Sequence, residues 1–415
     1  MLIGTNLKFA NSYNNRIILE VIRLHGPLSR AQISNLTELT AQTVTNITRK
    51  LLAEGLIIED SRYKSGHGAP SILLKIRENA AYSIGIDFDK DHLTTVIINF
   101  SGKICHRKSV NIHFPPPDET ISLMSNTVFE MIAKENIDMK LIWGVGIGLP
   151  GPLAISDESI VTNIVNPEAL PGWENVPIVQ ELENRLGLPV VLENNASGAA
   201  LGEYWYGDGK NMKSFFYVYF GAGLGGGVVI NGQLYSGSNG NAGELGYFPT
   251  PVFMANGQKY EHDHLGGYFN IPLLLKKIKK LGYEVSTIDD LVTLFDEGNP
   301  VMKEWLDSAS KNLAPLIQGV EYLIDPETIF FGGRLPESIL QSLLEKLKHY
   351  LPDHRITRQV KRPNFKIASS GIDAAALGVA SIPLYSSFAP QAKLLMKRRT
   401  NSLNTFDRIK IKNDK

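Results

Sequence analysis

The spacing of hydrophobic residues changes near residue 80 of this 415-residue chain. Before that point apolar residues recur every three or four positions, as on the buried face of a helix. After it they form short continuous runs, such as residues 84–88 and 95–100, which are typical of neighbouring strands in an α/β sheet. Because 415 residues also exceed what one compact core holds, we expect a small helical domain over residues 1–79 and a larger α/β part over residues 80–390.

The composition is that of a soluble globular protein, with 43% hydrophobic and 20% charged residues. No apolar run is long enough to span a bilayer, and the first residues lack a signal-peptide pattern, so we expect a cytoplasmic protein with no membrane partner. The single cysteine, Cys105, cannot form an internal disulfide or a thiolate metal site. We expect it to be a small buried hydrophobic residue.

The net charge is zero, but the charges are unevenly distributed. Residues 1–79 carry ten Lys and Arg against six Asp and Glu, which gives this segment a net charge of +4. A basic excess on a small module favours contact with nucleic acid. Residues 391–415 are also basic, and we expect them to form a solvated, disordered tail, with a second phosphate contact as the alternative.

The N-terminal module carries the start and stop signals of three helices. Apolar residues predict a first helix over residues 13–25, which Gly26-Pro27 ends. Ser29, three residues before Gln32, predicts a capping box and a short second helix. Thr40 is the expected cap of a third helix. The buried stripe of that helix comprises Val44, Ile47, Leu51 and Leu52.

The other face of the third helix is polar and hardly acidic. It comprises Gln42, Thr43, Thr45, Asn46, Arg49 and Lys50. Amide, hydroxyl and guanidinium groups match base edges and phosphates in a DNA major groove, whereas an ordinary solvated face more often carries Glu among its Lys and Arg. We therefore expect Gln42, Thr43 and Asn46 to read bases. Arg49 and Lys50 are expected to hold phosphates.

Two β-prone segments, residues 56–58 and 71–76, follow this helix and are joined by a glycine-rich turn that contains His67. Three helices and such a wing predict a winged helix-turn-helix that binds operator DNA, with His67 among the contacts. A protein-docking module is the alternative. Two such modules need two-fold symmetry to meet a palindromic operator, so we expect a homodimer or a dimer of dimers.

A glycine-rich stretch, residues 221–227, follows a predicted strand over residues 215–220. Glycines there let backbone N–H groups converge on an anion. A tight turn between two strands would need the same residues, and the sequence leaves both interpretations open.

This stretch is one of several short motifs that occur in a fixed order. The others are the end of a strand at Asp87, the Gly-Leu-Pro-Gly-Pro loop at 148–152, the Pro-Gly-Trp-Glu-Asn-Val-Pro segment at 171–177, Glu-Asn-Asn-Ala at 193–196, Ala-Gly-Glu-Leu-Gly at 242–246 and Phe-Gly-Gly-Arg at 331–334. The order resembles the ROK family of repressors, open reading frames and sugar kinases over residues 7–384. The resemblance implies an α/β, actin-like (ribonuclease H-like) fold of two lobes around a sugar cleft. With the winged module in front, the chain resembles the repressor branch, which includes xylose, glucose and N-acetylglucosamine regulators.

Three positions depart from the pattern of the family's kinases. Residues 87–91 read Asp-Phe-Asp-Lys-Asp where the kinases have Asp-x-Gly-Gly-Thr. Two extra carboxylates would repel ATP phosphates, and side chains fill the space that the glycines leave open in the kinases. Ala222 stands where a threonine hydroxyl is usual, and Asn195 replaces the catalytic aspartate. Asparagine cannot accept a proton near neutral pH. We therefore expect no enzyme activity, no catalytic residue and no nucleotide cofactor.

The family's zinc motif is also missing. Tyr247 stands in place of its histidine ligand, and residues 253–269 contain no cysteine. His264 takes the place of the last cysteine, and Gly266 that of a sugar-contacting glutamate. Residues 261–264 offer an alternative metal site, but adjacent loop residues seldom converge on one ion, so we expect no metal.

What remains is the part of the cleft that would bind a sugar. By resemblance, the sugar-binding residues are Gly151, Asn175, Asn194, Asn195, Glu244 and Tyr247. Tyr247 has the alternative role of a packed aromatic that fills the vacated zinc site. The sequence thus predicts a sugar-responsive DNA-binding repressor of carbohydrate-utilisation genes. An active ATP-dependent sugar kinase and a regulator with a vestigial cleft are the alternatives.

Overall fold

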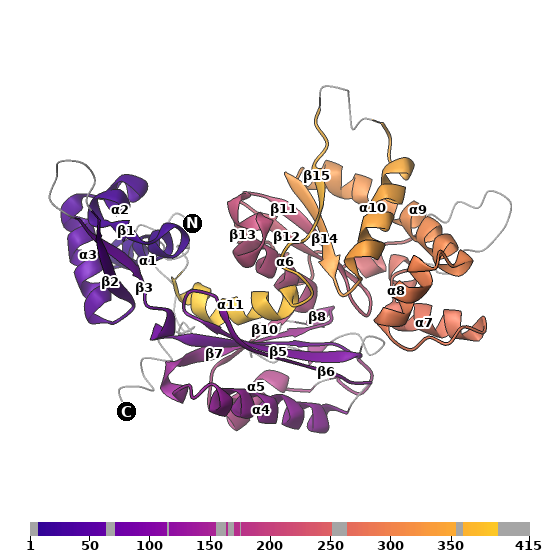
Figure 1. The fold of residues 1–415 in the computed structure, drawn as a ribbon, viewed down its shortest axis with the longest axis horizontal. Helices are drawn as coiled ribbons and strands as arrows, with labels where there is room; N and C mark the ends of the chain where they lie inside the picture. The colour runs from indigo at the N-terminus through magenta and orange to yellow at the C-terminus, as the bar shows by residue number, and fades with distance from the viewer. Residues whose placement is uncertain are drawn as a thin grey trace.

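The computed structural model describes residues 7–63, 71–113, 116–154, 163–164, 170–174, 176–250, 264–353 and 360–388. Within these ranges the chain forms an N-terminal module and two α/β lobes. Helices α6 (Asn195–Tyr206) and α11 (Ala374–Phe388) lie between the sheets of the lobes (Figure 1). No helix in these ranges is long and apolar enough to cross a membrane.

The N-terminal module contains the three predicted helices and a small antiparallel sheet. The helices are α1 (Leu7–His25), α2 (Arg30–Thr37) and α3 (Ala41–Ala53), and the sheet has the order β1-β3-β2, from β1 (Leu28–Ser29), β2 (Ile57–Tyr63) and β3 (Ser71–Ile76). The capping box of Ser29 and Gln32 and the cap of α3 by Thr40 are confirmed. Helix α1 begins six residues earlier than predicted, and β2 runs five residues further. Leu52, predicted in the buried stripe of α3, is only partly buried.

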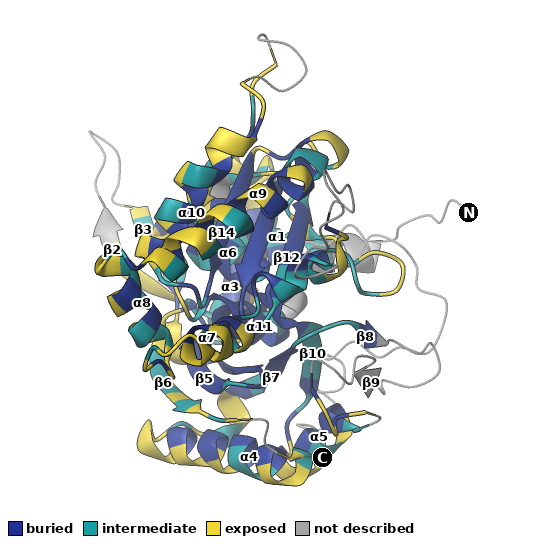
Figure 2. Cartoon of the chain, turned by 90° about the vertical axis from the view of Figure 1, so that its right-hand side faces the viewer, coloured by how far each residue is buried: buried dark blue, intermediate teal, exposed yellow. Residues whose placement is uncertain are grey.

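The first lobe is built on a five-stranded sheet with the order β10-β7-β4-β5-β6. Its strands are β4 (Tyr82–Phe88), β5 (His92–Asn99), β6 (Ile104–Asn111), β7 (Ile142–Leu149) and β10 (Val190–Asn194). Helices α4 (Pro117–Lys134) and α5 (Ile178–Leu186) cover one face, and α4 is buried toward the sheet and exposed away from it (Figure 2). Every residue of β4 is buried because helices cover both faces of the sheet. Cys105 on β6 is only half-buried, in contrast to the prediction.

The second lobe repeats this arrangement with the strand order β13-β12-β11-β14-β15. Its strands are β11 (Phe215–Phe220), β12 (Leu224–Ile230), β13 (Gln233–Leu234), β14 (Thr328–Gly333) and β15 (Asn364–Ile367). Helices α7 (Ile271–Lys280), α8 (Ile288–Asp296), α9 (Pro300–Leu323) and α10 (Glu337–Tyr350) bury a large apolar core against the sheet. In the first lobe, β8 (Leu153–Ala154) and β9 (Asn163–Ile164) form a short antiparallel ladder between β7 and α5 in the chain.

Helices α6 (Asn195–Tyr206) and α11 (Ala374–Phe388) cross in close contact between the two sheets. A Cβ atom on Gly378 would lie 1.7 Å from the carbonyl oxygen of Gly198, so only glycine permits this approach. Helix α11 also shares a hydrophobic cluster with the N-terminal module, in which Ile18, Ile22 and Leu384 are buried together. The module therefore rests on the first lobe through a continuous apolar core.

Candidate functional site

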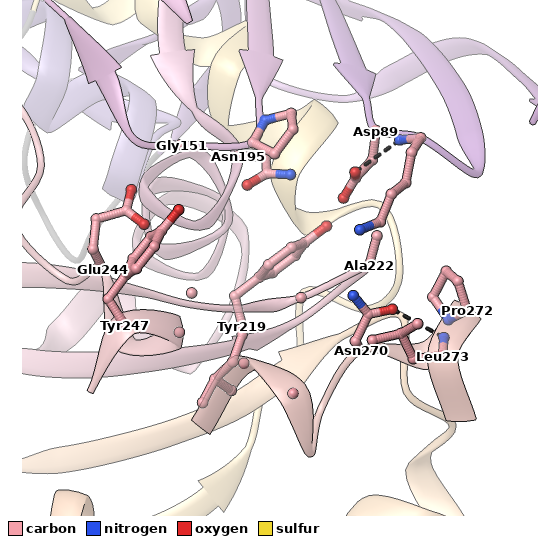
Figure 3. A pocket seen from close by; sticks show the side chains of 18 of the residues that line it. Asp89, Gly151, Asn195, Tyr219, Ala222, Glu244, Tyr247, Asn270, Pro272 and Leu273 are labelled. Atoms are coloured by element: carbon pink, nitrogen blue, oxygen red, sulfur yellow. Dashed lines mark hydrogen bonds between the residues drawn. The ribbon is translucent and has the colours of Figure 1, made fainter. Parts of the chain in front are cut away.

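A cavity of about 790 Å³ lies between residues of the two lobes. Asp89, Gly151 and Asn195 line it from the first lobe, and Glu244 and Tyr247 line it from the second. Figure 3 shows Glu244 and Tyr247 at one end, Asp89 and Ala222 at the other, and Asn195 between them. The structure thus brings together five of the six predicted sugar-binding residues, because Asn194 also lines this cavity. Asn175 lies outside the described residues.

Asn195, at the position of the kinases' catalytic aspartate, is the first residue of α6 and is 5% exposed. Its side-chain amide makes no hydrogen bond to the described residues, so it is free to bind a ligand in the cavity. Asn194 is differently placed. Its Oδ1 accepts hydrogen bonds from the backbone of Ala196 (2.8 Å) and Ser197 (3.3 Å) and so caps α6.

The other end of the Asn194 amide holds Glu244 in place. Asn194 Nδ2 donates to Glu244 Oε1 at 3.0 Å. A Cβ atom on Gly151 would lie only 2.0 Å from that oxygen and 2.4 Å from Asn194 Nδ2. Burial raises the pKa of Glu244 to about 7. Asn194 thus lines the cavity while its Oδ1 and one N–H are engaged within the protein, and its contact with Glu244 orients that carboxyl group. Its role as a direct sugar ligand stays a prediction.

Tyr247 lies on a short 3₁₀ turn, Leu245–Tyr247, and is 51% exposed at the cavity. Its ring centroid is 6.4 Å from that of His264, whose Nδ1 is 3.1 Å from the carbonyl oxygen of Gly246. An aromatic filling a vacated zinc site would be buried, so the cavity-lining role of Tyr247 is the one the structure favours. In the described ranges no three His, Cys, Asp or Glu side chains are grouped to hold a metal, and residues 261–263 fall outside those ranges.

The segment that replaces the kinases' first phosphate loop is a buried charge network. His92 lies between two carboxylates, with Nε2 3.0 Å from Asp87 Oδ2 and Nδ1 2.6 Å from Asp91 Oδ1. Burial acts to lower the pKa of His92, but the charge of Asp87 and hydrogen bonds to Asp87 and Asp91 raise it to about 9. Arg334 of the second lobe approaches Asp91 Oδ2 at 3.7 Å.

The network changes the charge that this segment presents to the cavity. The carboxylates of Asp87 and Asp91 are accompanied by the cations of His92 and Arg334, so they do not present an uncompensated negative charge. Asp89 and Lys90 line the cavity where the kinases have glycines. The charge of Asp91 is therefore compensated, and the side chains of Asp89 and Lys90 occupy the positions of the two glycines, as the sequence predicts.

The glycine-rich stretch is a tight turn followed by a strand. Gly221 N donates to Gly223 O at 2.9 Å, and β12 begins at Leu224. A Cβ on Gly225 would lie 2.7 Å from Ala196 Cβ, and one on Gly227 would lie 2.3 Å from Ala200 Cβ. Two of the five glycines, Gly225 and Gly227, thus let α6 pack on β12, which favours the turn over the anion cradle for this part of the stretch.

Comparison with known proteins agrees with this architecture. The family described as the ROK family matches residues 83–384 of the chain. The chain belongs to the ROK family.

Relatives of this ROK chain include named repressors. It is 32% identical over 380 residues to the xylose repressor of Caldicellulosiruptor bescii, covering 88% of this chain and 94% of the relative. It is 23% identical over 352 residues to the DNA-binding transcriptional dual regulator NagC of Escherichia coli, covering 80% of this chain and 83% of NagC.

Among solved structures, a ROK family transcriptional regulator, a homologue of the E. coli MLC protein, matches with a TM-score of 0.70 at 20% identity. The match covers 93% of this chain and 99% of the regulator. A ROK family glucokinase from Streptomyces griseus, in complex with glucose and AMPPNP, matches with a TM-score of 0.58 at 22% identity, over 73% of this chain and 99% of the kinase. These two likenesses show that the predicted actin-like fold is correct.

The second candidate surface of this ROK protein is the exposed face of α3. Gln42, Asn46, Arg49 and Lys50 are exposed there, and Thr43 and Thr45 are half-buried. The Thr45 hydroxyl donates to Ala41 O at 2.8 Å, and the Thr43 hydroxyl is 2.9 Å from that of Thr40. The two threonines are thus already engaged within the helix. His67 lies outside the described residues.

The contact between the N-terminal module and the ROK lobes was not predicted from the sequence. Arg23 of α1 lies over two rings, 4.7 Å from the centroid of Trp205 on α6 and 4.8 Å from that of Tyr385 on α11. The two rings are stacked with centroids 4.2 Å apart. Glu20 accepts hydrogen bonds from Arg23 Nε (2.9 Å) and Nη2 (2.6 Å). The only hint in the sequence is the aromatic run 204–206 on the helix that starts at Asn195.

Proposed function

We propose that this chain is a transcriptional regulator, acting as a repressor, whose affinity for operator DNA changes when a sugar binds between its lobes. The N-terminal module, residues 1–79, would bind DNA, and residues 80–390 would bind the sugar. The named repressors among its relatives support this function over that of a kinase. Asn195 supports it as well, because an amide cannot accept the proton of a sugar hydroxyl during phosphoryl transfer.

The observation that carries the proposal is the course of helix α6. Its N-terminus, at Asn194 and Asn195, is at the cavity, and its C-terminal turn carries Trp205 against Arg23 of the DNA-binding module. Twelve residues of helix span about 18 Å. One rigid element therefore contacts both the proposed sugar site and the proposed DNA reader.

The proposed switch uses this helix. A sugar that bonds to Asn195 of the first lobe and to Glu244 and Tyr247 of the second would draw the lobes together. Movement of α6 then shifts the Trp205 ring against Arg23 and tilts the module. In a homodimer this would change the separation of the two α3 helices and hence their fit to a palindromic operator. To turn occupancy from nearly full to nearly none, the sugar must prefer one state by about 5 kcal/mol.

The proposed DNA contacts follow from exposure on α3. Gln42 and Asn46 are expected to reach base edges, while Arg49 and Lys50 are expected to bind phosphates. Thr43 and Thr45 can contribute acceptor or methyl contacts, because their hydroxyls are otherwise engaged within the module.

The test is to select genomic DNA fragments that bind the purified chain and to map the protected bases with and without a panel of hexoses and pentoses. We expect a protected palindrome whose protection changes with one class of sugar. Steady ATP-dependent phosphorylation of any sugar in the panel would instead establish a kinase and overturn the proposal.

A further inference from the structure

The end of the cavity opposite Glu244 carries a buried lysine. Lys90, in the turn after β4, is only 9% exposed and lines the cavity. Its ammonium makes no hydrogen bond or ion pair with the residues that the structure describes, although its charge reaches the carboxyl group of Asp89. Burying a cation without a close counter-ion is costly. A ligand that brought an anion to this point would remove that cost.

The N-terminus of helix α7 opens onto the same end of the cavity. Asn270, Pro272 and Leu273 line the cavity, and Asn270 Oδ1 caps the helix by accepting from Leu273 N at 3.0 Å. Figure 3 shows these residues beside Ala222 and below Asp89. The first turn of α7 contains no acidic residue, whereas α8 has two. The positive end of the α7 dipole is therefore uncompensated by its own side chains.

A second cation of α7 completes the charge pattern. Lys276 is exposed, lies one turn into the helix and lines the cavity from the second lobe, opposite Lys90 of the first. Asp89 is the opposing charge at this end. Burial raises the pKa of Asp89 to about 6, and the charge of Asp91 adds to the increase. This end of the cavity thus carries two lysines and a helix N-terminus, all positive, against the carboxyl group of Asp89. The raised pKa of Asp89 makes that group less completely ionised than an ordinary aspartate.

We propose, on the basis of the function proposed above, that the effector is a monosaccharide that carries an anionic group, a phosphate ester or a carboxylate, bound by Lys90 at the N-terminus of α7. The sugar ring lies toward Asn195, Glu244 and Tyr247, whose polar groups suit hydroxyls. A cavity of about 790 Å³ is far larger than an inorganic anion requires and holds both parts of such a molecule. A neutral sugar would fill the hydroxyl end and leave Lys90 without a partner.

The experiment is titration calorimetry on the full chain with matched neutral and anionic sugars. The pairs are glucose with glucose 6-phosphate and with glucuronate, xylose with xylose 5-phosphate, and N-acetylglucosamine with its 6-phosphate. Inorganic phosphate and ATP are titrated separately. We expect one anionic sugar to bind at least tenfold more tightly than its neutral partner. The phosphate and carboxylate arms show which anionic group is recognised.

Variants locate the recognition. Lys90→Met should reduce the preference for the charged sugar to less than threefold while leaving the affinity for the neutral partner unchanged. Lys90→Arg should retain the preference, which would show that the effect of Lys90→Met is not a general loss of folding. Asp89→Asn should increase the preference, because it removes the opposing charge. Lys280→Gln, at the exposed C-terminal end of α7, is the matched control and should change nothing.

Several results would overturn the inference: equal affinity for the members of every pair, failure of every anionic sugar to bind, an unchanged preference in Lys90→Met, or binding of phosphate or ATP alone as tight as that of the best sugar. If a neutral sugar alone alters operator affinity, this inference fails and the proposed function stands. If an anionic sugar binds through Lys90 but no operator is found, the proposed function fails and this inference stands.

Discussion

The guanidinium group of Arg23 on α1 lies 4.7 Å from the ring centroid of Trp205 on α6. This contact joins the N-terminal module to the helix whose other end lies at the cavity. A cation over an aromatic face is worth about 0.5–2 kcal/mol, depending on desolvation, and Arg23 is largely buried. Because it lies beside the apolar cluster that the module shares with α11, we choose it as the place to separate ligand binding from the DNA response.

The variants Arg23→Met and Trp205→Leu should therefore uncouple the two sites. We expect sugar affinity within about threefold of wild type and a several-fold smaller effect of sugar on operator affinity. Calorimetry measures the first quantity and fluorescence anisotropy of a labelled operator the second. Tyr235→Leu, an exposed aromatic change on the second lobe, is the control. A full sugar response in both interface variants would show that α6 does not carry the signal through this contact.

The exposed cations of α3 should dominate DNA affinity without setting its sequence preference. Arg49→Ala and Lys50→Ala should each weaken binding to specific and random DNA alike. Each should also reduce the slope of log affinity against log salt by about 1, since each removes one phosphate contact. Lys134→Ala, an exposed lysine at the end of α4, should leave the slope unchanged. Unaltered salt slopes in the first two variants would remove α3 from the DNA interface.

Two glycines of the same stretch should respond differently to substitution. Gly227→Ala places a Cβ 2.3 Å from Ala200 Cβ, so α6 must move away from β12. We expect a loss of about 1–3 kcal/mol in the free energy of unfolding, measured by urea denaturation. Gly223→Ala meets nothing within 4 Å and should be close to neutral. Equal stability of the two variants would contradict the assignment of Gly227 to helix packing.

His92 should make stability depend on pH above neutrality. Its pKa of about 9 in the folded chain exceeds its ordinary value of 6.5, so its contribution is complete below pH 6.5 and is lost as the pH rises through 9. The shift corresponds to about 3 kcal/mol at most. The difference in thermal midpoint between wild type and His92→Gln should shrink from pH 6 to pH 10. Parallel profiles over that range would show that His92 is not held as a cation between Asp87 and Asp91.

Local signals in the sequence predicted local structure well. The capping box of Ser29 and the cap by Thr40 depend on residues three positions apart, and both are present in the structure. The glycine-rich stretch was ambiguous because the packing partner of Gly227 is on α6, which no local pattern reveals. The charge balance around Asp91 was misjudged for the same reason, since Arg334 comes from the other lobe.

In the candidate site, too, contacts between residues far apart in the sequence were not predicted. Resemblance to a family placed Asn195, Glu244 and Tyr247 in one cavity, and the structure agrees. The resemblance did not reveal that the Asn194 side chain forms hydrogen bonds with the backbone of α6 and with Glu244. Those partners come together only when the two lobes are assembled. Nor did it predict Arg23 against Trp205, whose contact depends on how the module sits on α6 and α11.

The most direct test of the account is operator affinity measured by fluorescence anisotropy while the sugar that binds the wild-type chain is titrated in. The wild-type chain should lose at least tenfold in operator affinity at saturation. Asn195→Ala should bind the operator equally well without sugar and respond little to it. If the sugar binds the wild-type cleft by calorimetry and operator affinity stays constant, the cleft does not control DNA binding by the N-terminal module, and the proposed switch is wrong.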